Sequence, residues 1–293
     1  MNPIDLEKMN KLPEAERYFD LNILWYFANR WVIRVLYPLP VTANQITVVT
    51  LVMGLIAVGC FLVPSYSGLL WGGIFFYAKI FFDNVDGNLA RVRGETSRVG
   101  RFLDSITDFV VTVLVYLALT FHLVRETGEA GLWLLGFFAL LSASVQCSYF
   151  VFYLVSHTSR VGAYSRNRVD ESVSAKDRED LESGTLGTTE LCLQRMHVFF
   201  YGWQDRLIES VDRVSRKYAG VRQDEAHSSQ WMADKLFLTL SSPLCLCTNN
   251  MLVVLFALLD QVQWGLIAVA LFMNIYLVGL QGWKVMRFRR MTA

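Results

Sequence analysis

The chain of 293 residues has few of the features that stabilise small secreted proteins. Its five cysteines are scattered and show neither the spacing of a zinc site nor the pattern of a disulfide framework. We therefore expect these cysteines to serve as small buried hydrophobic residues. The first twenty residues, Met1–Asp20, are polar and lack the order of basic, apolar and small residues that marks a signal peptide. No cleavage is expected there.

Apolar residues make up 54% of the chain, and aromatic residues 14%. A typical soluble domain has an apolar share of about 45–50%. A membrane-spanning helix needs about 20 mostly apolar residues. Six runs approach that length, and they predict an all-α polytopic membrane protein with six transmembrane helices and further amphipathic helices at the interface. The runs are Ile46–Val63, Ser67–Phe82 continuing to Arg91, Phe102–Val124, Gly131–Val155, Leu236–Leu259 and Val262–Val285.

Four aspartates lie between the apolar runs Trp71–Phe82 and Phe109–Leu119. On helices, Asp83 and Asp86 form an i,i+3 pair and Asp104 and Asp108 an i,i+4 pair, so each pair shares one helix face. Ionised carboxylates beside a membrane segment are costly unless they are compensated, and they indicate a functional site. A divalent cation with hard oxygen ligands, Mg²⁺ or Mn²⁺, would compensate them and would also bind substrate phosphate.

The spacing of these acids resembles the signature of the CDP-alcohol phosphotransferases. The pattern Asp-x2-Asp-Gly-x2-Ala-Arg-x8-Gly-x3-Asp-x3-Asp begins at Asp83 and ends at Asp108, and all eight fixed positions match. The family consists of integral membrane enzymes that displace CMP from a CDP-linked alcohol. The resemblance implies that Asp83, Asp86 and Asp104 ligate metal, and that Asp108 is a ligand, the general base, or both. It also implies that the site holds two Mg²⁺ or Mn²⁺ ions.

The small and basic residues of the same pattern are expected to bind the cytidine nucleotide. Gly87 and Gly100 have no Cβ and Ala90 has only a methyl group, so a nucleotide can approach the helices closely. Helix packing in a membrane favours the same small residues. The guanidinium of Arg91 suits phosphate oxygens, although it also suits an anchor at the membrane surface.

Three segments outside this pattern also carry expectations. Leu21–Tyr37 and Leu191–Val214 are predicted to be amphipathic helices, and Val169–Thr189 a loop or mobile segment. The stretch Thr42–Thr47 resembles a nucleotide-contacting segment of the family, but helix N-capping explains it better. A group of three basic residues is expected to bind the acceptor alcohol. Anchoring to anionic lipid is an equal alternative for this group. That group consists of Arg160, Arg166 and Arg168.

The distribution of Lys and Arg predicts the orientation. Basic residues are concentrated before the first span, in the second and fourth connections and in the tail, whereas connections one, three and five contain only Arg125. Both termini and the aspartates are therefore expected on the cytoplasmic side. The expected division of the chain is a cytoplasmic segment 1–41, spans one to four in 42–155, an insertion 156–235, and the last two spans with a basic tail in 236–293.

We expect a phosphatidyl transfer from CDP-diacylglycerol to a small hydroxylated acceptor, by an enzyme that forms a homodimer as most of the family does. No nucleic-acid partner is expected. One alternative is transfer from CDP-choline or CDP-ethanolamine to diacylglycerol. An alternative from another class is a divalent-cation transporter or binding protein, because acids between spans also form ion pathways. That alternative gives no role to the two glycines, Ala90 and Arg91 of the pattern.

Overall fold

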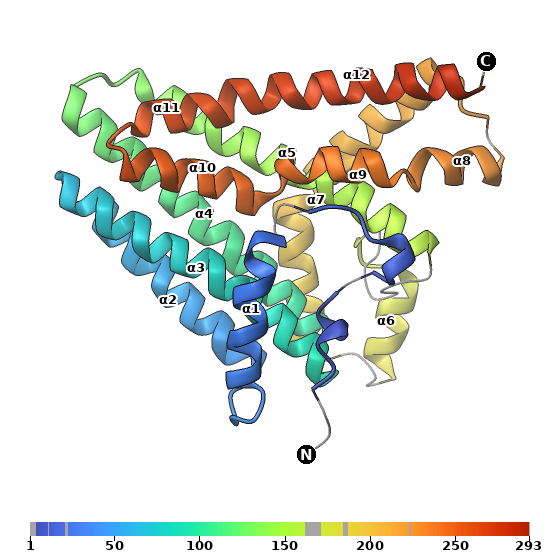
Figure 1. Ribbon diagram of the computed structural model, residues 1–293, viewed down its shortest axis with the longest axis horizontal. Helices are drawn as coiled ribbons and strands as arrows, with labels where there is room; N and C mark the ends of the chain where they lie inside the picture. Colours follow the sequence, from blue (N-terminus) through green and yellow to red (C-terminus); the bar gives the residue numbers. More distant parts are fainter. Residues whose placement is uncertain are drawn as a thin grey trace. The chain divides into compact units, whose positions relative to one another are not determined.

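The computed structural model describes residues 4–10, 12–20, 23–161, 171–183, 187–222 and 224–292. Every regular element in these ranges is a helix, which confirms the all-α prediction (Figure 1). The chain forms two compact units. The first comprises Met1–Asn10, Asn22–Leu141 and Cys247–Ala270, and the second comprises Lys11–Leu21, Ser142–Leu246 and Leu271–Ala293.

The first unit contains the short 3-10 helix η1 and the helices that carry the aspartates. Its elements are η1 (Leu6–Met9), α1 (Ile23–Leu36), α2 (Ala43–Phe61), α3 (Tyr66–Arg93), α4 (Arg98–Thr127), the start of α5 (Leu132–Arg160), most of α10 (Leu246–Leu258), α11 (Val262–Ile267) and part of the π-helix η4 (Ala268–Phe272). Helix α2 packs against both α3 and α4. Small residues allow this: a Cβ on Gly54 would lie 2.6 Å from Val111 of α4, and one on Gly72 would lie 2.4 Å from Phe61 of α2.

Serine side chains and glycines set the ends of the two helices that carry the acids. Helix α3 begins after Ser65, whose side chain accepts a hydrogen bond from the Gly68 amide, and ends at Gly94 with a φ of 72°. Only glycine adopts that left-handed conformation at little cost, so the helix stops there. Ser97 then caps α4 by accepting from the Gly100 amide at 3.0 Å. The turn between these caps brings α4 back beside the acidic end of α3.

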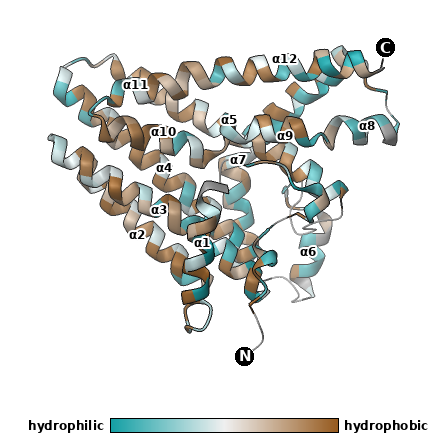
Figure 2. Ribbon diagram, in the orientation of Figure 1, coloured by the Kyte–Doolittle hydropathy of each residue, from teal (hydrophilic) through white to brown (hydrophobic). Residues whose placement is uncertain are grey.

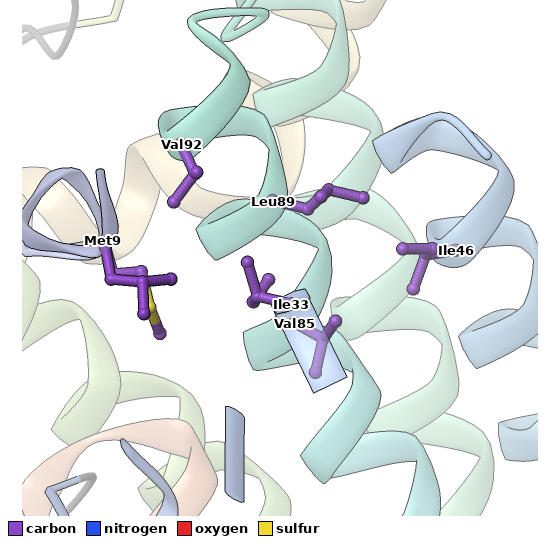
Figure 3. Close-up of a cluster of buried hydrophobic side chains, with 7 residues drawn as sticks. Met9, Ile33, Ile46, Val85, Leu89 and Val92 are labelled. Carbon is purple, nitrogen blue, oxygen red and sulfur yellow. The ribbon is translucent and has the colours of Figure 1, made fainter. Parts of the chain in front are cut away.

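A buried apolar cluster supports the acidic part of α3 from the side opposite the carboxylates. Figure 3 shows side chains from η1, α1, α2 and α3 directed toward one another. Ile33, Val85 and Leu89 are fully buried. Burial of such a side chain contributes roughly 1.5–3 kcal/mol. The cluster consists of Leu6, Met9, Ile33, Ile46, Val85, Leu89 and Val92.

Arg93 links the end of α3 to the chain between α1 and α2. Its guanidinium donates hydrogen bonds to the carbonyls of Leu36 at 2.8 Å, Tyr37 at 3.0 Å and Leu39 at 2.7 Å, and also to Val41. These carbonyls lie at and after the end of α1, where the helix leaves carbonyl groups without intrahelical partners. Arg93 thus fixes α1 and the start of α2 against α3.

The second unit is built around α5, α7 and α12. Its elements are η2 (Glu14–Glu16), the rest of α5, α6 (Ala175–Glu182), α7 (Thr188–Ala219), α8 (Glu225–Met232), α9 (Lys235–Ser241), η3 (Ser242–Leu244) and α12 (Met273–Thr292). Helix α12 packs against α7 and α9. The ammonium of Lys284 lies 3.5 Å from the ring centre of Tyr153, 4.3 Å from that of Trp231 and 4.0 Å from that of Phe237. Cation–π attraction of this kind compensates a buried cation.

Five helical segments of the described residues are long and apolar enough to cross a membrane: Ala43–Phe61, Arg98–Thr127, Leu132–Arg160, His227–Leu258 and Val262–Met291. Figure 2 shows hydrophobic residues along α2 and α10, which belong to two of these segments, whereas α6 is hydrophilic. The predicted count of six was one too high by this measure. The remaining predicted span is α3, a continuous helix of 28 residues. Lys79, Asp83, Asp86, Arg91 and Arg93 make its second half too polar to qualify.

The amphipathic helices and the polar insertion differ in how well the sequence predicted them. The predicted helices Leu21–Tyr37 and Leu191–Val214 are present as α1 and α7. The prediction of a loop or mobile segment at Val169–Thr189 was wrong for its centre, because α6 spans Ala175–Glu182. Ser174 and Asp177 form a reciprocal capping box there, with the Asp177 carboxylate accepting from the Ser174 amide at 2.9 Å. Such a box starts a helix without apolar periodicity.

Candidate active site

Three of the four predicted aspartates meet where α3 and α4 lie side by side. Asp83 of α3 and Asp104 and Asp108 of α4 each offer one carboxylate oxygen, and these oxygens lie within 4.8 Å of one another. The side chains of Asp83 and Asp108 are 13% and 19% exposed, so the group is largely withdrawn from solvent. The i,i+4 spacing places both α4 acids on one face, opposite the acid that α3 presents.

The fourth acid, Asp86, is held by α2. Its carboxylate accepts a hydrogen bond from the Thr47 hydroxyl at 2.6 Å, and the residue is 4% exposed. Thr47 lies in the second turn of α2, and Thr42 starts that helix through a capping box with Gln45. The N-capping interpretation of Thr42–Thr47 is therefore confirmed for Thr42. Sequence reasoning missed the contact of Thr47 with Asp86, because it depends on how α2 packs on α3.

Lys79 is a site residue that the sequence analysis did not single out. Its ammonium lies 3.0 Å from the Asp83 carboxylate and also forms an ion pair with Asp108. The Lys79 side chain is only 5% exposed. A lysine within the apolar run Trp71–Phe82 was the available signal, since ionisable residues in membrane segments are usually functional.

The two glycines of the pattern allow other side chains to approach α3 and α4 closely. A Cβ on Gly87 would lie 3.4 Å from the Arg91 guanidinium, which is ordinary contact. A Cβ on Gly100 would lie 3.2 Å from the side-chain oxygen of Asn44 and 3.1 Å from the Ser97 hydroxyl, so it would press against polar groups. Ala90 lies half-buried in the last turn of α3. Gly100 thus brings the start of α4 close to the start of α2.

Arg91 contacts the amino-terminal segment. Its Nε donates to the Met9 carbonyl at 2.9 Å, and a terminal nitrogen donates to the Asn88 side chain at 2.6 Å. The side chain therefore holds η1 against α3. The guanidinium also lies beside Gly87, the position where the sequence predicted close approach of a nucleotide.

The predicted acceptor residues are only partly within the described part of the chain. Arg160 is the last residue of α5, and it donates to the Ser228 hydroxyl at 3.1 Å. Arg166 and Arg168 lie outside the described residues. Arg160 belongs to the second unit, whereas the aspartates belong to the first.

The donor set at the aspartates fits a divalent cation. Three carboxylates converge from two helices, and carboxylate oxygens are the ligands that Mg²⁺ and Mn²⁺ prefer. The cluster also needs positive charge, which Lys79 supplies to two of its three acids. A site with three acids and one lysine retains capacity for a further cation.

Comparison with known proteins identifies the part of the chain that contains this site. Residues 40–170 match the family model named CDP-alcohol phosphatidyltransferase. This match covers α2, α3 and α4, and therefore all four aspartates, Lys79 and Thr47. This part of the chain is therefore similar to the CDP-alcohol phosphatidyltransferases.

Individual relatives of this part share about a third of its residues. The chain is 35% identical over 108 residues to a bifunctional IPC transferase and DIPP synthase of Aquifex aeolicus, and 34% identical over 109 residues to the protein of the same description from Thermococcus kodakarensis. It is 30% identical over 117 residues to a phosphatidylinositol phosphate synthase of Corynebacterium glutamicum. These matches cover 37–40% of this chain, 23% of each of the first two relatives and 49% of the third.

Proposed function

We propose that the protein transfers a phosphatidyl group from CDP-diacylglycerol to a small hydroxylated acceptor and releases CMP. The observation that carries the proposal is the meeting of Asp83, Asp104 and Asp108 inside the segment that matches the CDP-alcohol phosphatidyltransferase model. A carboxylate cluster of this kind would hold the cations that a pyrophosphate ester requires. Alternation of basic residues further supports an active site on the cytoplasmic side.

Each acid has a proposed role. Asp83, Asp104 and Asp108 would hold Mg²⁺ or Mn²⁺, and two ions would be shared with the substrate pyrophosphate. The ions would neutralise the phosphate oxygens and the departing CMP. The Thr47 hydroxyl donates to one carboxylate oxygen of Asp86 and orients it, and the other oxygen would bind an ion. Gly87, Ala90 and Gly100 would let cytidine lie against α3 and α4, and Arg91 would face its phosphates.

Asp108 is proposed to accept the proton of the acceptor alcohol. The alcohol oxygen would attack the phosphorus nearer diacylglycerol, the bond from that phosphorus to the oxygen of CMP would break, and the proton would pass to the carboxylate. Lys79 contacts both Asp83 and Asp108, and its ammonium would fix the direction of these carboxylates. It acts through the acids and is therefore a positioning residue in this proposal.

The activities for which the relatives are named favour a phosphorylated or inositol-type acceptor. One relative is described as a phosphatidylinositol phosphate synthase. Inositol phosphate is therefore the first acceptor to test, beside inositol, serine and glycerol phosphate. CDP-choline with diacylglycerol belongs to the same panel, because it tests the alternative direction of transfer.

The deciding experiment measures CMP release by the purified full chain in the presence of CDP-diacylglycerol, Mn²⁺ and each acceptor. We expect one acceptor to release CMP, EDTA to abolish the release, and added Mg²⁺ or Mn²⁺ to restore it. Asp104→Asn should lower the rate by at least about a hundredfold, whereas Asp260→Asn, in the first unit but outside the matched domain, should retain it. Full activity in EDTA would contradict the metal assignment.

Cross-linking of the same preparation would test the expected homodimer.

A further inference from the structure

A cavity of about 760 Å³ in the second unit is separate from the residues assigned above, apart from Arg160. It lies between the end of α5, the face of α7 from Val198 to Arg216, and the end of α8 at Met232. Only the α5 part belongs to the matched domain, which ends at residue 170. The cavity is thus a feature of the segment that the family match does not cover.

Two arginines from different helices converge at one end of this cavity. Arg160 of α5 and Arg216 of α7 both line it, and each donates a hydrogen bond to the Ser228 hydroxyl at 3.1 Å. The two guanidinium groups thus share one neutral acceptor. Asp212 balances the charge of Arg216, whereas the charge of Arg160 would attract an anion. Such an anion could accept hydrogen bonds from N–H groups of both guanidiniums in place of the shared hydroxyl.

Of the two arginines, Arg216 is paired with an acid, and Arg160 is paired with none that the structure describes. The whole lining has four arginines and four acids, but two of the acids are taken up by ion pairs within α7. Asp212 pairs with Arg216 at 2.7 Å, and Glu209 pairs with Arg213 at 3.0 Å. Among the described residues, Arg160 forms no ion pair with a carboxylate. Ser156 and Ser159 of α5 also line the cavity.

A buried network holds Arg216 in place before any ligand binds. The Asp212 carboxylate accepts from the Tyr153 hydroxyl at 2.7 Å and from the Trp231 indole at 2.8 Å, as well as from Arg216. Asp212 is 4% exposed, and Trp231 is 1% exposed. Three helices therefore fix the carboxylate, and the carboxylate fixes the guanidinium. Binding to a preorganised group loses less conformational entropy.

We propose that this cavity is a second binding site, which takes the phosphate of a phosphate ester between Arg160 and Arg216. The guanidinium groups would bind phosphate oxygens through paired N–H donors. The serine hydroxyls would add hydrogen bonds, and Glu171 and Asp205 of the cavity lining would accept from hydroxyl or ammonium groups of the same ligand. Either a lipid headgroup or a soluble phosphate ester has this chemistry.

The first arm of the test uses a soluble probe. The full chain in phosphatidylcholine nanodiscs is titrated with glycerol phosphate in EDTA, at constant ionic strength, and thermal unfolding is followed. We expect a saturable rise in Tm for the wild type. Arg160→Gln should weaken the apparent affinity roughly tenfold or more, because it removes charge-assisted hydrogen bonds. Arg195→Gln, on an exposed position of α7 outside the cavity, should match the wild type.

The second arm uses a lipid probe. The same three proteins are compared in nanodiscs with and without phosphatidic acid, and no soluble phosphate is added. A lipid headgroup in the cavity predicts a higher Tm with phosphatidic acid for wild type and Arg195→Gln, and a loss of that increase in Arg160→Gln. The proposal fails if neither probe gives a shift that depends on Arg160.

Ser228→Asp tests the site by placing an anion in it, so that the expected effect is a gain of stability. A carboxylate at this position would lie between both guanidiniums and mimic the ligand, so Tm should rise in the absence of phosphate and should no longer respond to it. Asp104→Asn separates this site from the aspartate cluster, because it should leave the response to phosphate unchanged. Loss of the response in Asp104→Asn would overturn the assignment to the second unit.

Discussion

Lys79 gives the aspartate cluster a positive charge that belongs to the protein itself. Its ammonium contacts Asp83 in the same helix and Asp108 in the next one. Three carboxylates within 4.8 Å of one another would otherwise depend entirely on added cations. The cluster is therefore partly neutralised before any ion or substrate binds, and Lys79 joins α3 to α4 across it.

Replacing Lys79 should make the stability of the protein depend more strongly on metal. Lys79→Met removes one partner from a buried group of charges, a change that typically costs about 3–5 kcal/mol. We expect a lower Tm in EDTA and a larger rise in Tm on addition of Mn²⁺ than in the wild type, measured by thermal unfolding in detergent.

Lys217→Met is the matched control, because Lys217 is an exposed lysine near the end of α7. It should unfold as the wild type does, with and without Mn²⁺. An equal response to Mn²⁺ in Lys79→Met and the wild type would show that Lys79 does not share the role of the cation.

At the scale of helices, the position of the acids depends on the close approach of α2 to its neighbours. Helix α2 packs on α4 at Gly54, where Val111 of α4 occupies the space that a side chain on residue 54 would need. It also carries Thr47, which orients Asp86 of α3. Side chains on α2 therefore contribute to the site even though the helix itself contains no acid of the cluster.

Gly54→Ala should lower stability and activity together. The new Cβ would lie 2.6 Å from Val111, and such overpacking usually costs about 1–3 kcal/mol. Gly59→Ala in the same helix meets no atom within 4 Å, and alanine favours a helix over glycine by roughly 0.5–1 kcal/mol. We expect the first variant to unfold at lower temperature than the wild type and the second at an equal or higher one. A stable and fully active Gly54→Ala variant would show that this contact does not position the site.

At the scale of the whole molecule, the orientation in the membrane follows from charge. The chain turns at Gly94 after Arg91 and Arg93, and it turns again at Gly128 after the single Arg125. Because basic residues remain in the cytoplasm, the first of these turns should face the cytoplasm and the second the opposite side.

Labelling with a membrane-impermeant maleimide would test this orientation. The intact cells would express a variant of the protein in which the five native cysteines are replaced. We expect Glu129→Cys to react without permeabilisation, and Glu95→Cys to react only after it. Both positions are exposed in the structure, so burial does not explain a difference between them. The reverse pattern would place the aspartates on the other side of the membrane.

The sequence predicted the helical class and the helices that carry the acids, because fixed spacing and apolar runs are local properties. It did not predict α6, whose capping box lies in a polar stretch without periodicity. It also did not predict that Thr47 and Lys79 contact the acids, because both contacts depend on tertiary packing. The count of spans differed for a related reason: the charges of α3 that form the site are the same charges that lower its hydropathy.

The pairing of Lys79 with Asp83 has a consequence for the order of synthesis. These two residues lie four apart in α3, so their ion pair can form as soon as that helix exists. The partners from α4 leave the ribosome later. The Asp83 carboxylate can therefore be neutralised before α4 is made, and this lowers the cost of placing an acid next to lipid at that stage.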